Sequence, residues 1–242
     1  GLSSADCGWS NDLSMFGSGL MAYYEVSGNR EALDYAVKFT RYFVEGWVPG
    51  SLDSEGRWGS GVWSSRLGTW LIGPLHYKGF ENLIGIYGDE AGWGFSSATC
   101  VEYLVRVFRA NGDSVLREKA VRSMGWCFDY CQFPDGAVGI HAKDDKWLGM
   151  TGGAIRQYTQ LVSNKMLTRE EQELYLPRVH RAFRWLLKMT KPENFPPDGV
   201  VYVNRQTMPN PGVNVVWLMA WAALGLLDAF WLFGGEGFTY RV

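Results

Sequence analysis

A pattern that occurs twice along the chain limits the possible folds more than any other feature. Gly28-Asn29 is followed after six residues by Ala36-Val37-Lys38, and Gly112-Asp113 is followed after six residues by Ala120-Val121-Arg122. Apolar residues recur at spacings of three and four around each pair, which is typical of amphipathic helices. Glycine ends a helix, and Asn or Asp caps the next one. The pattern therefore predicts pairs of helices joined by a short turn.

A second pattern indicates what connects one helical pair to the next. An acidic residue directly precedes a glycine at Glu55-Gly56, Asp135-Gly136 and Asp198-Gly199. Gly149 lies 13 residues after the second of these glycines and Gly212 lies 13 residues after the third, and each opens a strongly apolar segment. We therefore expect long, irregular loops that lead into apolar helices.

The two kinds of helix differ in composition. Segments after the short turns carry many charges, as in Arg117-Glu118-Lys119, whereas those after the long loops are small and apolar, as in Thr151-Gly152-Gly153-Ala154-Ile155. This difference predicts an all-α fold in which amphipathic helices cover an inner layer of apolar helices. The expected helical segments are 20–26, 31–44, 100–109, 115–130, 170–189 and 213–233.

The stretch between residues 60 and 95 does not fit this scheme. Several glycines and Pro74 interrupt any long helix there, so we expect a broken hairpin or a glycine-rich insertion. No linker or low-complexity segment divides the chain. The sequence therefore predicts a single domain over residues 1–242.

Charge and apolar content exclude several classes of partner. The chain has 23 basic and 25 acidic residues, a balance that predicts no nucleic-acid binding. Its most apolar stretch, residues 213–233, contains Asn214 and Asp228, so we interpret it as a buried core helix and expect no membrane partner. Dinucleotide, phosphate-loop, serine-hydrolase and metalloprotease motifs are missing, and no cofactor is expected.

The cysteines indicate packing and not metal binding. Cys127 and Cys131 are four residues apart in an expected helix, so they share a face and are predicted to be buried. The sequence contains no C-x-x-C pair, and we predict no metal site. This usage slightly favours a reducing compartment such as the cytoplasm.

The repeated G-[ND]-x6-A-V-[KR] and [ED]-G-x-x-G patterns resemble those of the (α/α) toroid superfamily, which includes six-hairpin glycosidases and toroid polysaccharide lyases. The resemblance covers most of the chain and rests on architectural motifs. It implies alternating inner and outer helices, with the long loops around a funnel that binds substrate. About four to five hairpins fit into 242 residues, which implies an incomplete ring or a piece of a longer protein. Further domains or a further chain would then complete the ring.

Two kinds of catalysis are compatible with the residues on the expected loops. Glycoside hydrolysis usually needs two carboxylates, and the candidates are Asp53, Glu55, Asp144, Asp145 and Asp198. Asp198 and Asp135 each precede a glycine, so capping of their own turns is the alternative reading. Solvated surface charge is the alternative for Asp144 and Asp145.

A polysaccharide lyase would use a different set. It needs a base to take a proton and cationic or amide groups to neutralise a uronate carboxylate. Histidine suits proton transfer near neutral pH, so His141 is a candidate base, and a structural or merely exposed role is its alternative reading. Alternation in V-V-Y-V-N would place Tyr202 and Asn204 on one face of an extended segment, next to Arg205.

Aromatic side chains favour a carbohydrate substrate, since flat rings stack on the C–H faces of sugars. The expected loops or their borders hold the substrate-binding candidates Trp47, Trp58, Trp63, Trp147 and Arg66. Packing is the alternative for each tryptophan. The sequence thus predicts a carbohydrate-active enzyme with an oligo- or polysaccharide substrate, and a glycoside hydrolase before a polysaccharide lyase. The remaining alternative is a non-catalytic helical-repeat module that binds glycan or protein.

Overall fold

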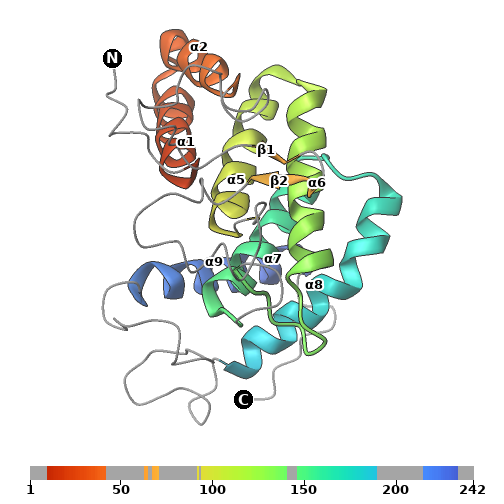
Figure 1. Ribbon diagram of the computed structural model, residues 1–242. Helices are drawn as coiled ribbons and strands as arrows, with labels where there is room; N and C mark the ends of the chain where they lie inside the picture. Colours follow the sequence, from red (N-terminus) through yellow and green to blue (C-terminus); the bar gives the residue numbers. More distant parts are fainter. Residues whose placement is uncertain are drawn as a thin grey trace, which may run out of the picture. The chain divides into compact units, whose positions relative to one another are not determined.

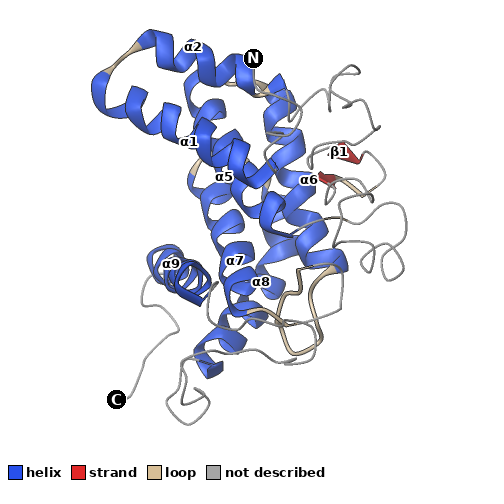
Figure 2. Ribbon diagram, turned by 60° about the vertical axis from the view of Figure 1, so that its left-hand side comes forward, coloured by secondary structure: helices blue, strands red, loops and turns tan. Residues whose placement is uncertain are grey.

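A computed structural model describes residues 10–41, 63–64, 67–70, 92, 94–140, 146–189 and 215–233. Helices make up most of this part of the chain (Figures 1 and 2), as the all-α prediction requires. The chain divides into two compact units, residues 1–126 and 127–242, and the division falls inside a helix. The elements of the first unit are α1 (Ser10–Ser27), α2 (Arg30–Phe39), β1 (Trp63–Ser64), β2 (Thr69–Trp70), α5 (Gly94–Asn111) and most of α6 (Ser114–Tyr130).

Both predicted short turns are present and have the expected caps. Gly28 and Gly112 have φ values of +71° and +70°, a left-handed conformation that costs glycine little. The N–H of Ala32 donates to Oδ1 of Asn29 at 3.1 Å, and the N–H of Val115 donates to Oδ1 of Asp113 at 2.9 Å. The first turn joins α1 to α2, which lie side by side (Figure 2), and the second joins α5 to α6.

Close packing of α1 on α5 forms the core of the first unit. The ring of Tyr103 on α5 is buried, and its hydroxyl donates to the backbone carbonyl of Ala36 on α2. A Cβ atom on Gly17 of α1 would lie 2.5 Å from this ring. Glycine at position 17 therefore allows α1 to approach α5 closely.

Two short strands, β1 and β2, form an element that the sequence did not predict. β1 and β2 pair antiparallel, with Trp63 opposite Trp70 and Ser64 opposite Thr69, and Gly68 in the turn has a φ of +74°. The Thr69 hydroxyl lies 3.1 Å from that of Ser123 on α6, which in turn lies 2.7 Å from the hydroxyl of Ser97 on α5. All three are fully buried, so they satisfy one another and attach the hairpin to the helices.

The second unit is built around α7 (Leu148–Ser163), which packs against α8 (Arg169–Met189) and α9 (Val215–Phe233). Twelve of the sixteen residues of α7 are buried, as expected for an inner helix. A Cβ on Gly152 of α7 would lie 2.5 Å from the carbonyl oxygen of Trp221 and 2.6 Å from Cα of Ala222, both on α9. Gly225 of α9 in turn faces the Gly152 backbone. Small residues therefore bring the two helix backbones into direct contact.

The helix α8 has the amphipathic character predicted for an outer helix. Tyr175, Val179, Ala182, Phe183 and Leu186 are buried on one face, and charged side chains lie between them in the sequence. Arg178 of this helix pairs with Asp129 near the end of α6. The predicted boundaries of α8 differ from the observed ones by one residue at the N-terminal end.

The prediction of a buried core helix at residues 213–233 is correct for only one side of α9. Ala222, Gly225 and Ala229 are buried, whereas Phe230 and Trp231 are 55% and 74% exposed. Apolar composition alone does not distinguish a helix buried on all sides from one with an apolar outer face. Among the described helices, none combines the length and the apolarity needed to cross a membrane.

Candidate functional site

Most of the predicted site residues lie outside the residues that the structure describes. This applies to all nine catalytic candidates, Asp53, Glu55, His141, Asp144, Asp145, Asp198, Tyr202, Asn204 and Arg205, and to Trp47, Trp58 and Arg66. Their roles remain predictions. The structure describes the side chains of only two substrate-binding candidates, Trp63 and Trp147.

Trp63, in the first unit, is half-buried and surrounded by cationic and aromatic side chains. Its ring centroid lies 4.9 Å from that of Trp70. Nζ of Lys119 lies 4.1 Å from the Trp63 centroid, and the Arg122 guanidinium carbon lies 5.8 Å from it. Burial lowers the pKa of Lys119 to about 8, with the charge of Glu118 acting in the opposite direction and that of Arg122 in the same one. These neighbours give Trp63 a packing role and a cation–π role within its own unit.

Trp147, in the second unit, is 7% exposed and occupies the position just before α7. Its N–H donates to the carbonyl of Val138 at 3.1 Å, and the N–H of Val138 donates to Oγ1 of Thr151 at 2.9 Å. In this arrangement Trp147 packs and fixes the loop that enters α7, and little of its ring is open to a ligand.

The same loop contains the acidic–glycine turn at Asp135-Gly136. The N–H of Ala137 donates to Oδ1 of Asp135 at 3.3 Å, so Asp135 caps its own turn as the alternative reading predicted. Gly136 has a φ of +104°, and a Cβ there would collide with the carbonyl of Arg181 on α8. The buried side chain of Gln132 donates to the carbonyl of Arg178 at 2.8 Å. The turn is therefore held directly against α8.

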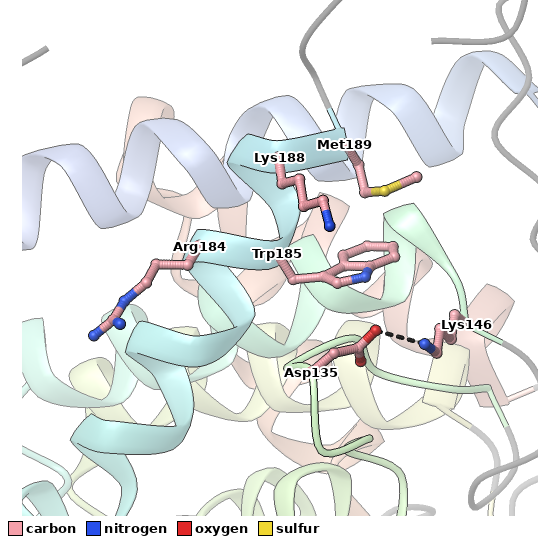
Figure 3. A pocket seen from close by; sticks show the side chains of 6 residues that line it. All are labelled: Asp135, Lys146, Arg184, Trp185, Lys188 and Met189. Atoms are coloured by element: carbon pink, nitrogen blue, oxygen red, sulfur yellow. Dashed lines mark hydrogen bonds and ion pairs between the residues drawn. The ribbon is translucent and has the colours of Figure 1, made fainter. Parts of the chain in front are cut away.

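Where this turn meets the end of α8, the second unit has a pocket of about 410 Å³ (Figure 3). This volume is within the range of about 300 to 1,000 Å³ that is usual for small-molecule sites. Its lining comes from the turn, from the residue two before α7 and from the last two turns of α8. The residues are Asp135, Lys146, Arg184, Trp185, Lys188 and Met189.

Three basic side chains and one acidic side chain line the pocket. Nζ of Lys146 lies 2.5 Å from Oδ2 of Asp135, and this ion pair lies below the Trp185 ring in Figure 3. The ammonium of Lys188 extends toward Trp185 from the other side, whereas the Arg184 guanidinium points away from the group. The pocket is therefore rich in positive charge and in hydrogen-bond donors. The pKa of the neighbouring His180 is lowered, first by partial burial and then by the charge of Arg184.

Trp185 itself supplies an unsatisfied donor. The residue is only 6% exposed, and among the described residues no acceptor takes a hydrogen bond from its indole N–H. The nitrogen lies on the edge of the ring that faces Asp135 and Lys146 (Figure 3). A buried indole N–H usually has a partner, so this edge of the pocket is suited to an acceptor atom of a ligand.

The sequence patterns did not identify these residues as a site. Arg184, Trp185 and Lys188 belong to a segment predicted only as part of an outer helix, and Lys146 belongs to a segment predicted only as a loop. The available signal was the basic and aromatic end of α8, R-W-L-L-K-M, directly before a predicted loop. Within the described ranges no group of three or more His, Cys, Asp or Glu side chains could hold a metal ion.

Comparison with known proteins identifies the fold. No family model and no curated protein match the chain. A glycosyl hydrolase of family 88 from Bacteroides vulgatus matches 91% of the chain with a TM-score of 0.62 at 14% identity. A polysaccharide lyase matches 96% with a TM-score of 0.62 at 16% identity, and a sugar epimerase from a ruminal bacterium matches 94% with a TM-score of 0.65 at 14% identity.

These matches confirm that the chain has the (α/α) toroid fold. The chain spans only 61%, 63% and 56% of the three solved structures, respectively. It therefore corresponds to part of the ring that those proteins form.

Proposed function

We propose that the chain belongs to a carbohydrate-active enzyme that acts on an oligo- or polysaccharide. One observation carries the proposal: over more than nine tenths of its length the chain shares its fold with structures described as a glycosyl hydrolase, a polysaccharide lyase and a sugar epimerase. The pocket of the second unit supports it, because it combines a small-molecule volume with charged groups and an apolar edge of Trp185 and Met189.

Glycoside hydrolysis is the reaction we favour. In hydrolysis, one carboxylic acid protonates the leaving oxygen while a second carboxylate activates water or attacks the sugar. Asp144 and Asp145 directly precede the pocket residue Lys146 in the sequence, which supports them as candidates together with Asp198. Asp53 and Glu55 remain further candidates from the first unit. A carboxyl separation of about 5 to 5.5 Å would give retention, and one of about 6.5 to 9.5 Å inversion.

A specific observation also supports the lyase alternative. Lyase chemistry needs positive or amide groups that neutralise a uronate carboxylate, and the pocket has Lys146 and Lys188. In that reaction His141 or Tyr202 would take the proton, with Asn204 and Arg205 as partners for the carboxylate. Further hairpins, from the same protein or from another chain, would complete the ring around such a site.

A panel of neutral and acidic polysaccharides tests the proposal. Release of reducing ends without new ultraviolet absorbance would indicate hydrolysis, and release with the absorbance of an unsaturated product would indicate a lyase. Under the hydrolase proposal we expect Asp144→Asn, Asp145→Asn or Asp198→Asn to reduce turnover by at least about a hundredfold. Asp113→Asn is the matched control, since Asn caps a helix as well as Asp. Binding without any product would favour the non-catalytic module. The absence of both binding and product would contradict the proposal.

A further inference from the structure

We infer that one side of α9 docks an amphipathic helix from a part of the ring outside this chain. This side, the outer face of α9, consists of the exposed positions among the described side chains of the helix, Ala220, Ala223, Leu224, Leu227, Phe230 and Trp231. Docking at the outer face does not depend on which reaction the protein catalyses.

Every position of the outer face carries an apolar side chain. The positions recur at spacings of three and four, so they lie on one side of the helix. Leu227 is 50% exposed and Trp231 is 74% exposed. The single charged residue of α9, Asp228, pairs with Arg156 on α7 at 3.0 Å and adds no charge to the outer face. A continuous apolar stripe of this kind is typical of an interaction surface.

The neighbouring helices of the second unit leave the outer face open. α7 lies against the opposite side of α9, where Gly152 and Gly225 bring the two backbones into contact. α8 packs against α7 and also contacts α9, yet the six positions remain exposed. In Figure 2 no other helix of the second unit lies on the side of α9 that faces away from α7. The inner helix α7 thus has neighbours on two sides, whereas α9 lacks one.

The order of the described helices indicates what kind of helix is missing. A short turn joins α1 to α2 and α5 to α6, and a short connection joins α7 to the amphipathic outer helix α8. α9 is of the apolar, inner kind, and no outer helix follows it within the described residues. The solved structures that share the fold are longer, since the chain spans 61%, 63% and 56% of them. A helix of the remaining ring is therefore favoured over a second copy of this chain.

The helix α8 shows what the occupant should look like. Its buried stripe runs from Tyr175 through Val179 and Ala182 to Leu186, again at spacings of three and four. This stripe and the outer face of α9 each extend over eleven residues, or about 16 Å along a helix. The side of α8 that faces water is mostly charged. An amphipathic helix of this type would cover the outer face and present charge to solvent.

A fluorescently labelled peptide with the sequence of residues 168–189 tests the inference. It contains α8 and its cap Thr168, and its anisotropy is followed as the full chain is added. We expect saturable binding, and we expect Leu227→Lys and Trp231→Lys each to weaken it at least about tenfold, because each removes apolar surface that docking would bury. Absence of binding to the parent chain, or unchanged affinity in Leu227→Lys, would overturn the inference.

Leu174→Lys is the matched control. Leu174 is a leucine of the same unit with a similar exposure of 56%, but it lies on α8. The affinity of this variant for the peptide should equal that of the parent chain. An equal loss in Leu174→Lys and Leu227→Lys would show general attraction to apolar surface and would contradict a specific docking face.

Two measurements without the peptide complete the test. Sedimentation velocity should show a monomer, and a dimer that Leu227→Lys dissociates would mean that a second copy of the chain occupies the face, which would overturn the choice of occupant. Leu227→Lys and Trp231→Lys should keep the Tm within about 2 °C of the parent chain, because both side chains are exposed. Unfolding of either variant would contradict an open face.

Discussion

The contact between α7 and α9 gives the sharpest prediction about stability. In Gly152→Ala the new Cβ would lie 2.5 Å from the carbonyl oxygen of Trp221 and 2.6 Å from Cα of Ala222. Both are backbone atoms, so a side-chain rotation cannot relieve the overlap. The two helices would have to separate by about 1 Å to restore ordinary van der Waals distances. Such overpacking costs about 1 to 3 kcal/mol, against a gain of up to about 1 kcal/mol in helix propensity.

We therefore expect Gly152→Ala to lower the free energy of unfolding by about 1 to 2 kcal/mol and the Tm by about 2 to 8 °C. Gly19→Ala is the control, because it lies inside α1 with no atom near the new Cβ, and it should leave stability unchanged or raise it by up to about 1 kcal/mol. Thermal and urea unfolding followed by circular dichroism measure both. The reasoning is refuted if Gly152→Ala is as stable as the parent chain.

Three further predictions concern other parts of the fold. Gly136→Ala should lower the free energy of unfolding by about 3 kcal/mol, because alanine would be strained at a φ of +104° and its Cβ would overlap the Arg181 carbonyl. An unchanged midpoint of urea unfolding would contradict this. Asp228→Asn breaks a 3.0 Å ion pair with Arg156, whose two side chains are each about one quarter exposed. It should lower the free energy of unfolding by about 1 kcal/mol in the same assay. A variant as stable as the parent chain would argue against a stabilising pair. Burial lowers the pKa of Lys119 from 10.5 to about 8, so between these values the unfolded chain holds more protons than the folded chain. Stability should therefore rise with pH across this window, and Lys119→Met should flatten that rise in urea titrations at several pH values; an identical slope in the variant would contradict the shift.

Local patterns predicted the parts of the fold that depend on local physics. The glycine of each short turn adopts the left-handed conformation, and the following Asn29 or Asp113 caps the next helix, because both effects involve residues close in sequence. Cys127 and Cys131 are buried as predicted, although α6 ends at Tyr130 and Cys131 lies directly after it. The paired strands around Gly68 were not predicted, since their two-residue length leaves no alternating pattern to detect.

The pocket could not be predicted because it depends on contacts between distant segments. Trp185 and Lys188 look like ordinary positions of an amphipathic helix until the Asp135-Gly136 turn packs against α8. Periodicity also predicted α9 as a core helix, yet only the face with small residues is buried against α7. Both outcomes are set by which surfaces meet, and hydrophobic spacing within a single segment does not contain that information.

The most direct test of the account is hydrogen–deuterium exchange of the chain with and without oligosaccharides from the neutral and acidic polysaccharides of the panel. We expect slower exchange in the loop segment 133–147 and in the last two turns of α8, around Trp185 and Lys188, with α1 and α2 unchanged. Slower exchange in 198–205 as well would place the candidate Asp198 near the bound sugar. No change in the loop or in α8, or protection confined to other segments, would contradict a carbohydrate site at this pocket.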